Sequence, residues 1–202
     1  MYNYVLICIA CCTILQFFNA LCTCSSSGKT EETHLMKMKA YEKIVSKALS
    51  KAKYRHVNKC KSEVLNVMKI YRGLSPKFEK FIFDNGEEKD LLNLVGTIPV
   101  DYKGHTYNIP IQLWFLYDFP VGSCPMGFVV PTKDMQLKVS NYVDHTGKIV
   151  LSYLNTWQYP SSNLIGMIQA CREGFGCLPP VFAKTVSFNN FVFIEICPPT
   201  CV

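Results

Sequence analysis

Cysteine is the residue type in this chain with the widest scope for chemistry, because its thiolate serves both as a nucleophile and as a metal ligand. The chain contains 11 cysteines, and seven of them crowd into the first 24 residues and the last six. The other four, Cys60, Cys124, Cys171 and Cys177, are widely spaced and form no Cys-x-x-Cys pair. This pattern is typical of reduced thiols in a cytosolic domain rather than of disulfides or zinc ligation. We expect neither a metal nor a cofactor.

The composition indicates a folded chain with one strongly basic segment. Aromatic residues make up 13% and hydrophobic residues 49% of the 202 residues, which excludes a disordered chain and allows one sizeable core. Residues 37–61 contain nine Lys and Arg against the single acid Glu42, while the rest of the chain holds 12 basic and 14 acidic residues. Because the basicity is local, it argues against a nucleic-acid-binding domain, and we expect no nucleic-acid partner.

The first 22 residues are almost wholly apolar, and no Lys or Arg precedes Lys29. Three interpretations stay open. The first is a secretory signal peptide, which normally begins with basic residues that are absent here. Phe18-Asn-Ala20 supplies only half of the cleavage site that such a signal needs. A transmembrane anchor needs roughly 20 apolar residues, which Tyr4 to Cys24 just provides. The third interpretation, which we favour, is that residues 1–30 are an extension that does not belong to the ancestral domain, with Ser25 to Gly28 as a linker.

Two helices are predicted after this linker. Apolar residues recur at steps of three and four from Leu35 to Leu49, which indicates an amphipathic helix. Its other side carries a basic row, Lys39, Lys43, Lys47 and Lys51. Such a row is ordinarily a solvated face, and attraction to an anionic membrane is the alternative. A second helix is predicted from Ser62, as the N-cap, to Tyr71, and Ser75-Pro76 is expected to end the helical region.

The middle of the chain is predicted to form antiparallel strands. Lys77 to Phe83 alternates polar and apolar residues before the turn Asp84-Asn85-Gly86, and a further strand is predicted over Leu91 to Val95. The stretch from Gly96 to Leu116 is predicted to form two strands around the turn Lys103-Gly104-His105. Because proline cannot donate to a ladder, Pro110 predicts that the second strand is an edge or is locally open there.

An open strand edge beside aromatic side chains is a place where an extended peptide can dock. Tyr102 and Tyr107 are candidates for such walls, whereas we assign Trp114 to the core. Farther along, Met126 to Val130 is predicted as a short strand, Asp144 to Gly147 as a turn, and a helix is expected from near Ser161. The order of helix, meander, irregular stretch and helix predicts an α+β domain.

Several short motifs then occur in one specific order. They are Gly96-Thr-Ile-Pro-Val100, Thr106-Tyr-Asn-Ile-Pro-Ile111, Val143-Asp144, Gly147-Lys-Ile149, Tyr153-Leu154, Trp157 with Pro160, and Pro179-Pro-Val-Phe182. In this order they resemble the ubiquitin-conjugating-enzyme variant (UEV) domain, in the branch of the family that serves the endosomal sorting complex ESCRT-I. The resemblance covers about residues 39–184 and implies a ubiquitin-conjugating-enzyme-like fold. We therefore place the UEV domain at residues 31–184, between the apolar extension at 1–30 and an unrelated apolar tail at 185–202.

The resemblance also implies that the chain is not an enzyme. Ubiquitin transfer proceeds through a thioester, so a cysteine must stand at one fixed place. In active members of the wider fold that cysteine follows an Asn-Gly-x-Ile turn, where this chain has Thr146-Gly-Lys-Ile149 and then Val150. The upstream His-Pro-Asn element is replaced by Ser140-Asn-Tyr142. A displaced nucleophile at Cys124 is the alternative, although no His or acid lies close to it in sequence.

Two binding surfaces follow from the resemblance. The first is a groove for Pro-Thr/Ser-Ala-Pro motifs, in which Tyr102, Tyr107, Met135 and Phe182 form apolar walls, and Asn108 and main-chain groups near Thr132 hold the polar atoms of the peptide. Ala183 replaces a serine of the family there. The full set is Thr97, Tyr102, Tyr107, Asn108, Pro110, Thr132, Met135, Val181 and Phe182.

The second surface, for ubiquitin, comprises Ile82, Asp84, Asn85 and Phe128. The family has Asn-Asp at the hairpin tip, where this chain has Asp84-Asn85, and Val130 replaces a basic residue. These two changes alter the charge of the surface and its hydrogen-bond donors.

The expected function is that of a non-catalytic adaptor for ubiquitinated cargo and for proteins with Pro-Thr/Ser-Ala-Pro motifs. It would act in the cytoplasm at endosomal membranes, and it would meet other ESCRT-I subunits only if a missing C-terminal region exists. Two alternatives from other classes stay open: a membrane-tethered or secreted protein that carries the UEV domain as a passenger, and a conjugating enzyme that uses a displaced cysteine.

Overall fold

The structure, a computed structural model, describes residues 31–184 of the chain. The predictions for residues 1–30 and for the tail at 185–202 lie outside these described residues. Within residues 31–184, no helix combines the length and the apolar character needed to cross a membrane.

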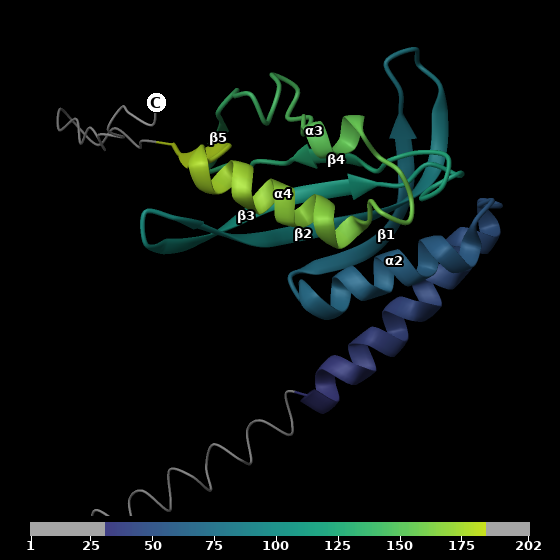
Figure 1. Cartoon of the computed structure of the whole chain (residues 1–202). Coiled ribbons are helices and arrows are strands. Elements are labelled where there is room, and N and C mark those ends of the chain that lie inside the picture. Colours follow the sequence, from purple (N-terminus) through teal and green to yellow (C-terminus); the bar gives the residue numbers. More distant parts are fainter. Residues whose placement is uncertain (1–30, 185–202) are drawn as a thin grey trace, which may run out of the picture.

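The main sheet contains four antiparallel strands in the order β1-β2-β3-β4, so each strand pairs with its neighbour in sequence (Figure 1). The strands are β1 (Leu74–Ile82), β2 (Glu88–Tyr102), β3 (His105–Trp114) and β4 (Met126–Val129). Two shorter strands, β5 (Met135–Leu137) and β6 (Val181–Ala183), pair antiparallel in a second sheet. The predicted meander is therefore confirmed.

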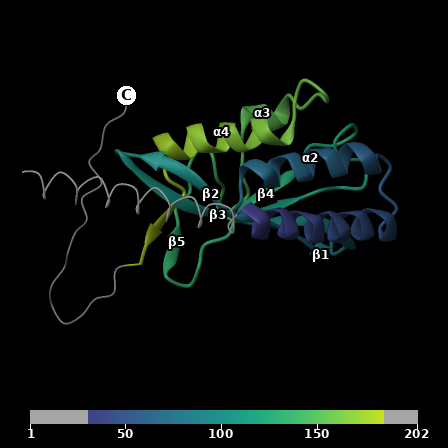
Figure 2. The same ribbon diagram turned by 90° about the horizontal axis from the view of Figure 1, so that it is seen from below.

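The helices cover one face of the main sheet. They are the first helix over residues 31–51, α2 (Val57–Ile70), the short α3 (Ser152–Asn155) and α4 (Leu164–Cys177). The first helix and α2 lie side by side (Figure 2), joined by an exposed ion pair of 2.8 Å between Lys61 and Glu42. α4 packs across β2. The arrangement confirms an α+β fold with the predicted amphipathic helix at its start.

The core lies between the helices and the sheet, and strand alternation decides which side chains enter it. Leu92, Leu94, Ile98 and Val100 of β2 belong to one buried cluster with the apolar side of α4. That side of α4 consists of Leu164, Met167, Ile168, Cys171 and Phe175, all fully buried. The intervening residues of β2 face away from the helices, as the period of two in a strand requires.

Two helix boundaries differ from the predictions. α2 begins at Val57, so Ser62 lies inside the helix instead of capping it. α4 begins at Leu164 rather than near Ser161, because the side chain of Asn163 accepts a hydrogen bond from Gly166 N at 2.9 Å. Glu63 of α2 also accepts one from Leu164 N, at 2.8 Å. The first of these α4 caps is local, but the second joins residues that are far apart in the sequence.

The predicted strand boundaries were also partly wrong. Ser75-Pro76 lies within β1, and α2 has already ended at Ile70. An edge strand tolerates proline, and β1 is an edge of the sheet. The two strands expected on either side of Gly96 form the single 15-residue strand β2, since β1 pairs with it up to Gly96 and β3 continues the ladder. The short elements α3, β5 and β6 were not predicted.

Candidate functional site

The far end of β2 leaves the sheet as a two-stranded ribbon. β1 pairs with β2 only as far as Gly96, and β4 pairs with β3 only over Ile111–Trp114. Among the described strands, residues 97–110 therefore pair only with one another, and hydrogen bonds from Thr97 N to Gly73 O and from Val130 N to Pro110 O join the base of this ribbon to the domain. The ribbon ends in a two-residue loop in which Lys103 (φ 50°) and Gly104 (φ 78°) both have positive φ. This geometry suits the right-handed twist of a hairpin and confirms the predicted turn.

The ribbon carries five of the predicted groove residues. The rings of Tyr102 and Tyr107 have centroids 6.4 Å apart, and Tyr107 is 49% exposed. Thr97 lies directly opposite Pro110 in the register. Asn108 is exposed. The structure thus brings these side chains onto one short piece of the molecule.

Pro110 lies where β4 ends, as its missing N–H predicts. Its carbonyl oxygen accepts a hydrogen bond of 3.1 Å from Val130 N, one residue past the end of β4. From Pro110 to the turn, no strand of the described chain pairs with β3 on its outer side. The prediction of a locally open strand is confirmed, although β3 as a whole is an inner strand of the sheet.

The other predicted groove residues lie on and beside the small β5–β6 sheet. Met135 pairs with Ala183, and Phe182 pairs with Gln136. Phe182 is 47% exposed, whereas Val181 is half-buried against the core. Thr132 accepts a hydrogen bond from Met135 N at 2.9 Å through its carbonyl oxygen. Since Thr132 follows Val130 by two residues, the bond between Val130 and Pro110 connects this second group to the ribbon.

Two surface hollows lie elsewhere. One, of about 380 Å³, lies between the end of the first helix and the β1–β2 hairpin and includes Lys51, Lys53, Phe78 and Tyr117. The other, of about 350 Å³, lies beside the loop that contains Cys124 and includes Met126 and Trp157. Neither includes a predicted groove or ubiquitin-binding residue.

The opposite end of β2 carries the predicted ubiquitin-binding tip. Ile82 is the last residue of β1 and is 62% exposed, and Asp84 and Asn85 follow it in an exposed turn. The side-chain oxygen of Asn85 accepts a hydrogen bond of 3.0 Å from Glu87 N. Asn85 therefore shapes the turn locally, as Asx residues commonly do.

An aromatic cluster lies beside this tip, and sequence analysis had singled out only two of its members. The ring of Phe81 meets those of Phe83, Trp114 and Phe128 at centroid distances of 4.8, 5.0 and 6.2 Å. Ile82 alternates to the other face, so Phe81, rather than Ile82, lies beside Phe128. The alternation from Lys77 to Phe83 contained the signal for Phe81 and Phe83, but the strand register was needed to pair them with Phe128. Trp114 is buried, as predicted.

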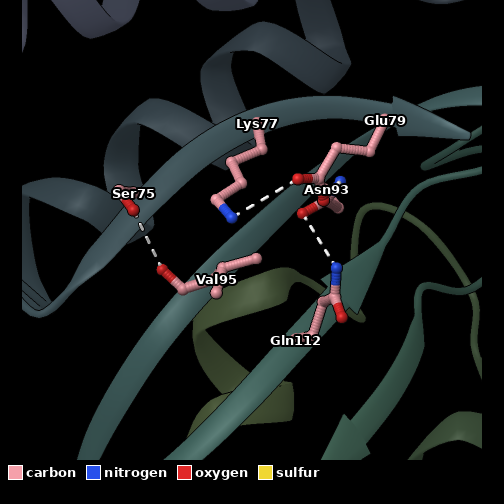
Figure 3. Close-up of polar contacts among 6 residues, drawn as sticks. All are labelled: Ser75, Lys77, Glu79, Asn93, Val95 and Gln112. Atoms are coloured by element: carbon pink, nitrogen blue, oxygen red, sulfur yellow. Dashed lines mark hydrogen bonds and ion pairs between the residues drawn. The ribbon is translucent and has the colours of Figure 1, made fainter. Parts of the chain in front are cut away.

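A row of polar contacts crosses the neighbouring strands β1, β2 and β3 (Figure 3). Asn93 is completely buried, and its amide donates to Glu79 Oε2 at 3.3 Å while its oxygen accepts from Gln112 Nε2 at 3.2 Å. Lys77 forms an ion pair of 3.3 Å with Glu79, and Ser75 Oγ donates to Val95 O at 3.1 Å. Because both ends of the Asn93 amide are bonded, the buried polar group is satisfied.

The positions considered for catalysis hold no activated nucleophile. Val150 is 44% exposed, and its N–H donates to Tyr142 O at 2.8 Å. Burial raises the pKa of the Cys124 thiol, which disfavours the reactive thiolate. Burial also raises the pKa of the Cys171 thiol, to about 12. All four cysteines of the described residues are free thiols, and residues 31–184 contain no group of three potential metal ligands.

The fold agrees with the comparison to known families. The UEV domain model matches residues 45–183, so the chain belongs to the UEV domain family. It is an inactive variant of the ubiquitin-conjugating fold, with Val150 where the nucleophile would stand.

Among individual proteins, the chain is 43% identical over 150 residues to the human tumor susceptibility gene 101 protein and 34% identical over 151 residues to Protein ELC of Arabidopsis thaliana. These alignments cover 74% and 71% of this chain but 38% of each relative. The chain thus spans well under half the length of these curated relatives.

Two solved structures share the fold. The yeast vps23 UEV domain in complex with a vps27 PSDP peptide superimposes with a TM-score of 0.59 at 22% identity, covering 67% of this chain and 90% of that one. A complex of the Vps23 UEV with ubiquitin gives a TM-score of 0.57 at 20% identity, covering 66% and 91%.

Proposed function

We propose that this chain is a non-catalytic adaptor that binds ubiquitin at one end of its sheet and Pro-Thr/Ser-Ala-Pro motifs at the other, in ESCRT-I-type sorting of ubiquitinated cargo. The observation that carries the proposal is the ribbon over residues 97–110, with an open strand edge from Pro110 to the turn and an exposed Tyr107 beside it. Its relatives include an ESCRT-I complex subunit, and the two fold neighbours hold a PSDP peptide and ubiquitin.

The groove would suit a proline-rich ligand for a physical reason. Such peptides are nearly preformed as polyproline II helices, so aromatic walls gain contact area at little cost in conformational entropy. Tyr102 and Tyr107 would supply one wall, and Met135 and Phe182 the other. Asn108 and the main chain near Thr132 would hold the polar atoms of the peptide, with Thr97, Pro110 and Val181 completing the floor. Ala183 offers no hydroxyl, so one polar contact of the family is lost.

The ubiquitin surface would consist of Ile82, Asp84 and Asn85 at the tip together with Phe128 on the sheet. We add Phe81, because it lies between the tip and Phe128 and would support the exposed part of that ring. Asp84-Asn85 places the carboxylate one position earlier than the family does, and Val130 removes a positive charge. Both changes favour a weaker complex with ubiquitin.

The bounds of the folded domain and its cellular location are also part of the proposal. We assign the folded domain to residues 31–184, since every residue of the buried core lies between Val45 and Phe175. Association with endosomes and with other ESCRT-I subunits would require regions that the longer relatives possess and this chain does not span.

A titration monitored by chemical shifts tests both surfaces in the full chain. Isotope-labelled protein receives first a Pro-Thr-Ala-Pro peptide and then ubiquitin. The peptide should shift Tyr102, Tyr107 and Phe182, whereas ubiquitin should shift Asp84, Asn85 and Phe128. Tyr102→Ala and Phe182→Ala should each weaken peptide binding by at least about 1 kcal/mol, the usual threshold for a binding hot spot. Peptide-induced shifts at Asp84 and Phe128 alone would show that the groove has been placed on the wrong surface.

The non-catalytic part has its own test. With activating enzyme, ATP and ubiquitin present, no adduct sensitive to dithiothreitol should form, because Val150 offers no thiolate. A thioester in the wild type that disappears in Cys124→Ser would establish the displaced-cysteine alternative instead. Cys177→Ser is the matched control, since Cys177 is exposed but lies at the end of α4.

A further inference from the structure

The ribbon that carries the proposed groove has little support from the sheet. Residues 97–102 extend beyond the last β1 pair, and residues 105–110 extend beyond the last β3–β4 pair. A two-stranded hairpin is marginally stable on its own in water. Its orientation therefore depends on contacts with the rest of the domain. Ile98, Val100 and Ile109 supply part of that support by entering the core.

Arg172 of α4 supplies a second, polar support. Its Nε donates to Pro99 O at 2.7 Å, and its Nη2 lies 3.3 Å from Asp101 Oδ2. Asp101 in turn accepts a hydrogen bond of 2.5 Å from Thr106 Oγ1, across the ribbon. One guanidinium thus reaches the first strand of the ribbon at two points and the second strand through Asp101.

These contacts adjoin the aromatic walls. Asp101 directly precedes Tyr102, and Thr106 directly precedes Tyr107. Arg172 bonds the strand beyond the last β1 pair, where no strand within residues 31–184 neighbours β2 on that side. The fixed fork geometry of a guanidinium lets it hold a carbonyl and a carboxylate at once, which a lysine ammonium does poorly.

We propose that Arg172 is a positioning residue for the peptide groove, holding the ribbon against α4 so that Tyr102 and Tyr107 face the motif. The inference rests on the proposed function, because it concerns that same groove. Arg172 does not itself touch the peptide. It raises affinity by increasing the fraction of molecules whose ribbon is already in the binding orientation, and the apparent Kd varies inversely with that fraction.

The test compares full-length Arg172→Ala and Arg172→Lys with wild type. Affinity for a Pro-Thr-Ala-Pro peptide should fall about tenfold in Arg172→Ala, corresponding to loss of one charge-assisted hydrogen bond, and by less in Arg172→Lys. Amide exchange over residues 97–107 should accelerate in free Arg172→Ala and return to the wild-type rate when peptide is saturating. Arg55→Ala is the matched control, because Arg55 is exposed and its main chain bonds Tyr117 O, outside the ribbon.

Two further readouts separate positioning from a general loss of structure. The urea unfolding midpoint and the affinity for ubiquitin should stay close to wild type in Arg172→Ala. Equal peptide affinity in wild type and Arg172→Ala would overturn the inference and leave the proposed function standing. A parallel fall of peptide affinity, ubiquitin affinity and unfolding midpoint would overturn it too. If wild type itself bound no peptide, the proposed function would fail, and the inference with it.

Discussion

The two ends of β2 differ in how neighbouring residues cover the exposed end of the strand. At the Glu88 end, three aromatic rings pack around Phe81, and Ile82 and the polar turn at Asp84-Asn85 project into solvent. At the Tyr102 end the strand continues past its β1 neighbour, and its partner β3 keeps an open edge near Pro110. The first end is closed by burial, whereas the second is held by a helix and leaves backbone groups accessible.

This difference indicates what each end can recognise. A closed end with a projecting turn presents a shaped surface, which suits a folded partner. An open edge with aromatic neighbours suits an extended peptide, which supplies main-chain groups and a few side chains. The buried Asn93 and its half-buried partner Gln112 lie between the two ends, so the two proposed surfaces are separate on one sheet.

The strongest test of the closed end is Trp114→Ala. Trp114 is 7% exposed and packs edge-on against Phe81, so truncation should destabilise the fold by about 3–5 kcal/mol. Urea unfolding measures the change, with Trp114→Phe as the control that keeps a ring at this position. A loss below about 1 kcal/mol would mean that burial does not close this end.

The two turns allow a matched comparison. Gly86 (φ 81°) and Gly104 (φ 78°) both adopt a left-handed conformation, and an added Cβ would meet nothing within 4 Å at either site. Alanine should therefore cost about 1–2 kcal/mol at each, from the backbone conformation alone. In titrations of the folded proteins, Gly86→Ala should change ubiquitin binding and Gly104→Ala peptide binding. The reverse assignment would exchange the roles of the two ends.

Lys103→Asn should stabilise the open end slightly. Lys103 has positive φ, which asparagine tolerates better, and Asn-Gly is the preferred pair for this hairpin loop. The substitution also removes the contact between the Lys103 ammonium and the Tyr102 ring, 5.2 Å from its centroid. Because such an exposed contact contributes about 0.5 kcal/mol, the net gain should be about 0.5 kcal/mol. Thermal unfolding measures it, with Lys133→Asn as a control at an exposed turn, and a fall in stability would contradict it.

The smallest change in the free energy of unfolding is expected at the turn from Asp144 to Gly147. Asp144 Oδ1 accepts hydrogen bonds from Thr146 Oγ1, Thr146 N and Lys148 N, and the hydroxyl of Thr146 is the main reason that the pKa of Asp144 is lowered. The ionised Asp144 therefore stabilises the fold above the ordinary carboxyl pKa near 4. This stabilisation is lost as pH falls through the lowered pKa of Asp144. Solvent screening limits it to a few tenths of a kcal/mol.

Urea unfolding from pH 7 to pH 2.5 checks this effect. Asp144→Asn should show a shallower loss of stability below about pH 4 than wild type. Asp134→Asn is the control, because the Asp134 side chain makes no hydrogen bond or ion pair within residues 31–184. An identical acid slope in wild type and Asp144→Asn would contradict the assignment.

Sequence patterns sufficed where a local rule decides the outcome. The period of Leu35 to Leu49, the turns at Asp84 and Lys103, and the local opening at Pro110 each follow from a few neighbouring residues. Sequence patterns did not predict the boundaries of α2 and α4. At the start of α4, Leu164 N donates to Glu63, which lies on another helix. Phe81 and Arg172 were missed for the same reason: their importance depends on partners more than 30 residues away. The groove and ubiquitin-binding residues stay predictions.

The length of β2 has a consequence for ligands that carry both signals. Fifteen residues of strand span about 50 Å, so no four-residue motif can reach from one end to the other. A ubiquitinated protein that also bears a proline motif would engage both ends only if the chain between the two signals, together with ubiquitin itself, bridged the distance between them. With a shorter spacer the second contact contributes nothing, whereas a matched spacer multiplies two weak affinities through effective concentration. The length of β2 would then determine which spacings between the two signals on a cargo protein allow both of them to bind.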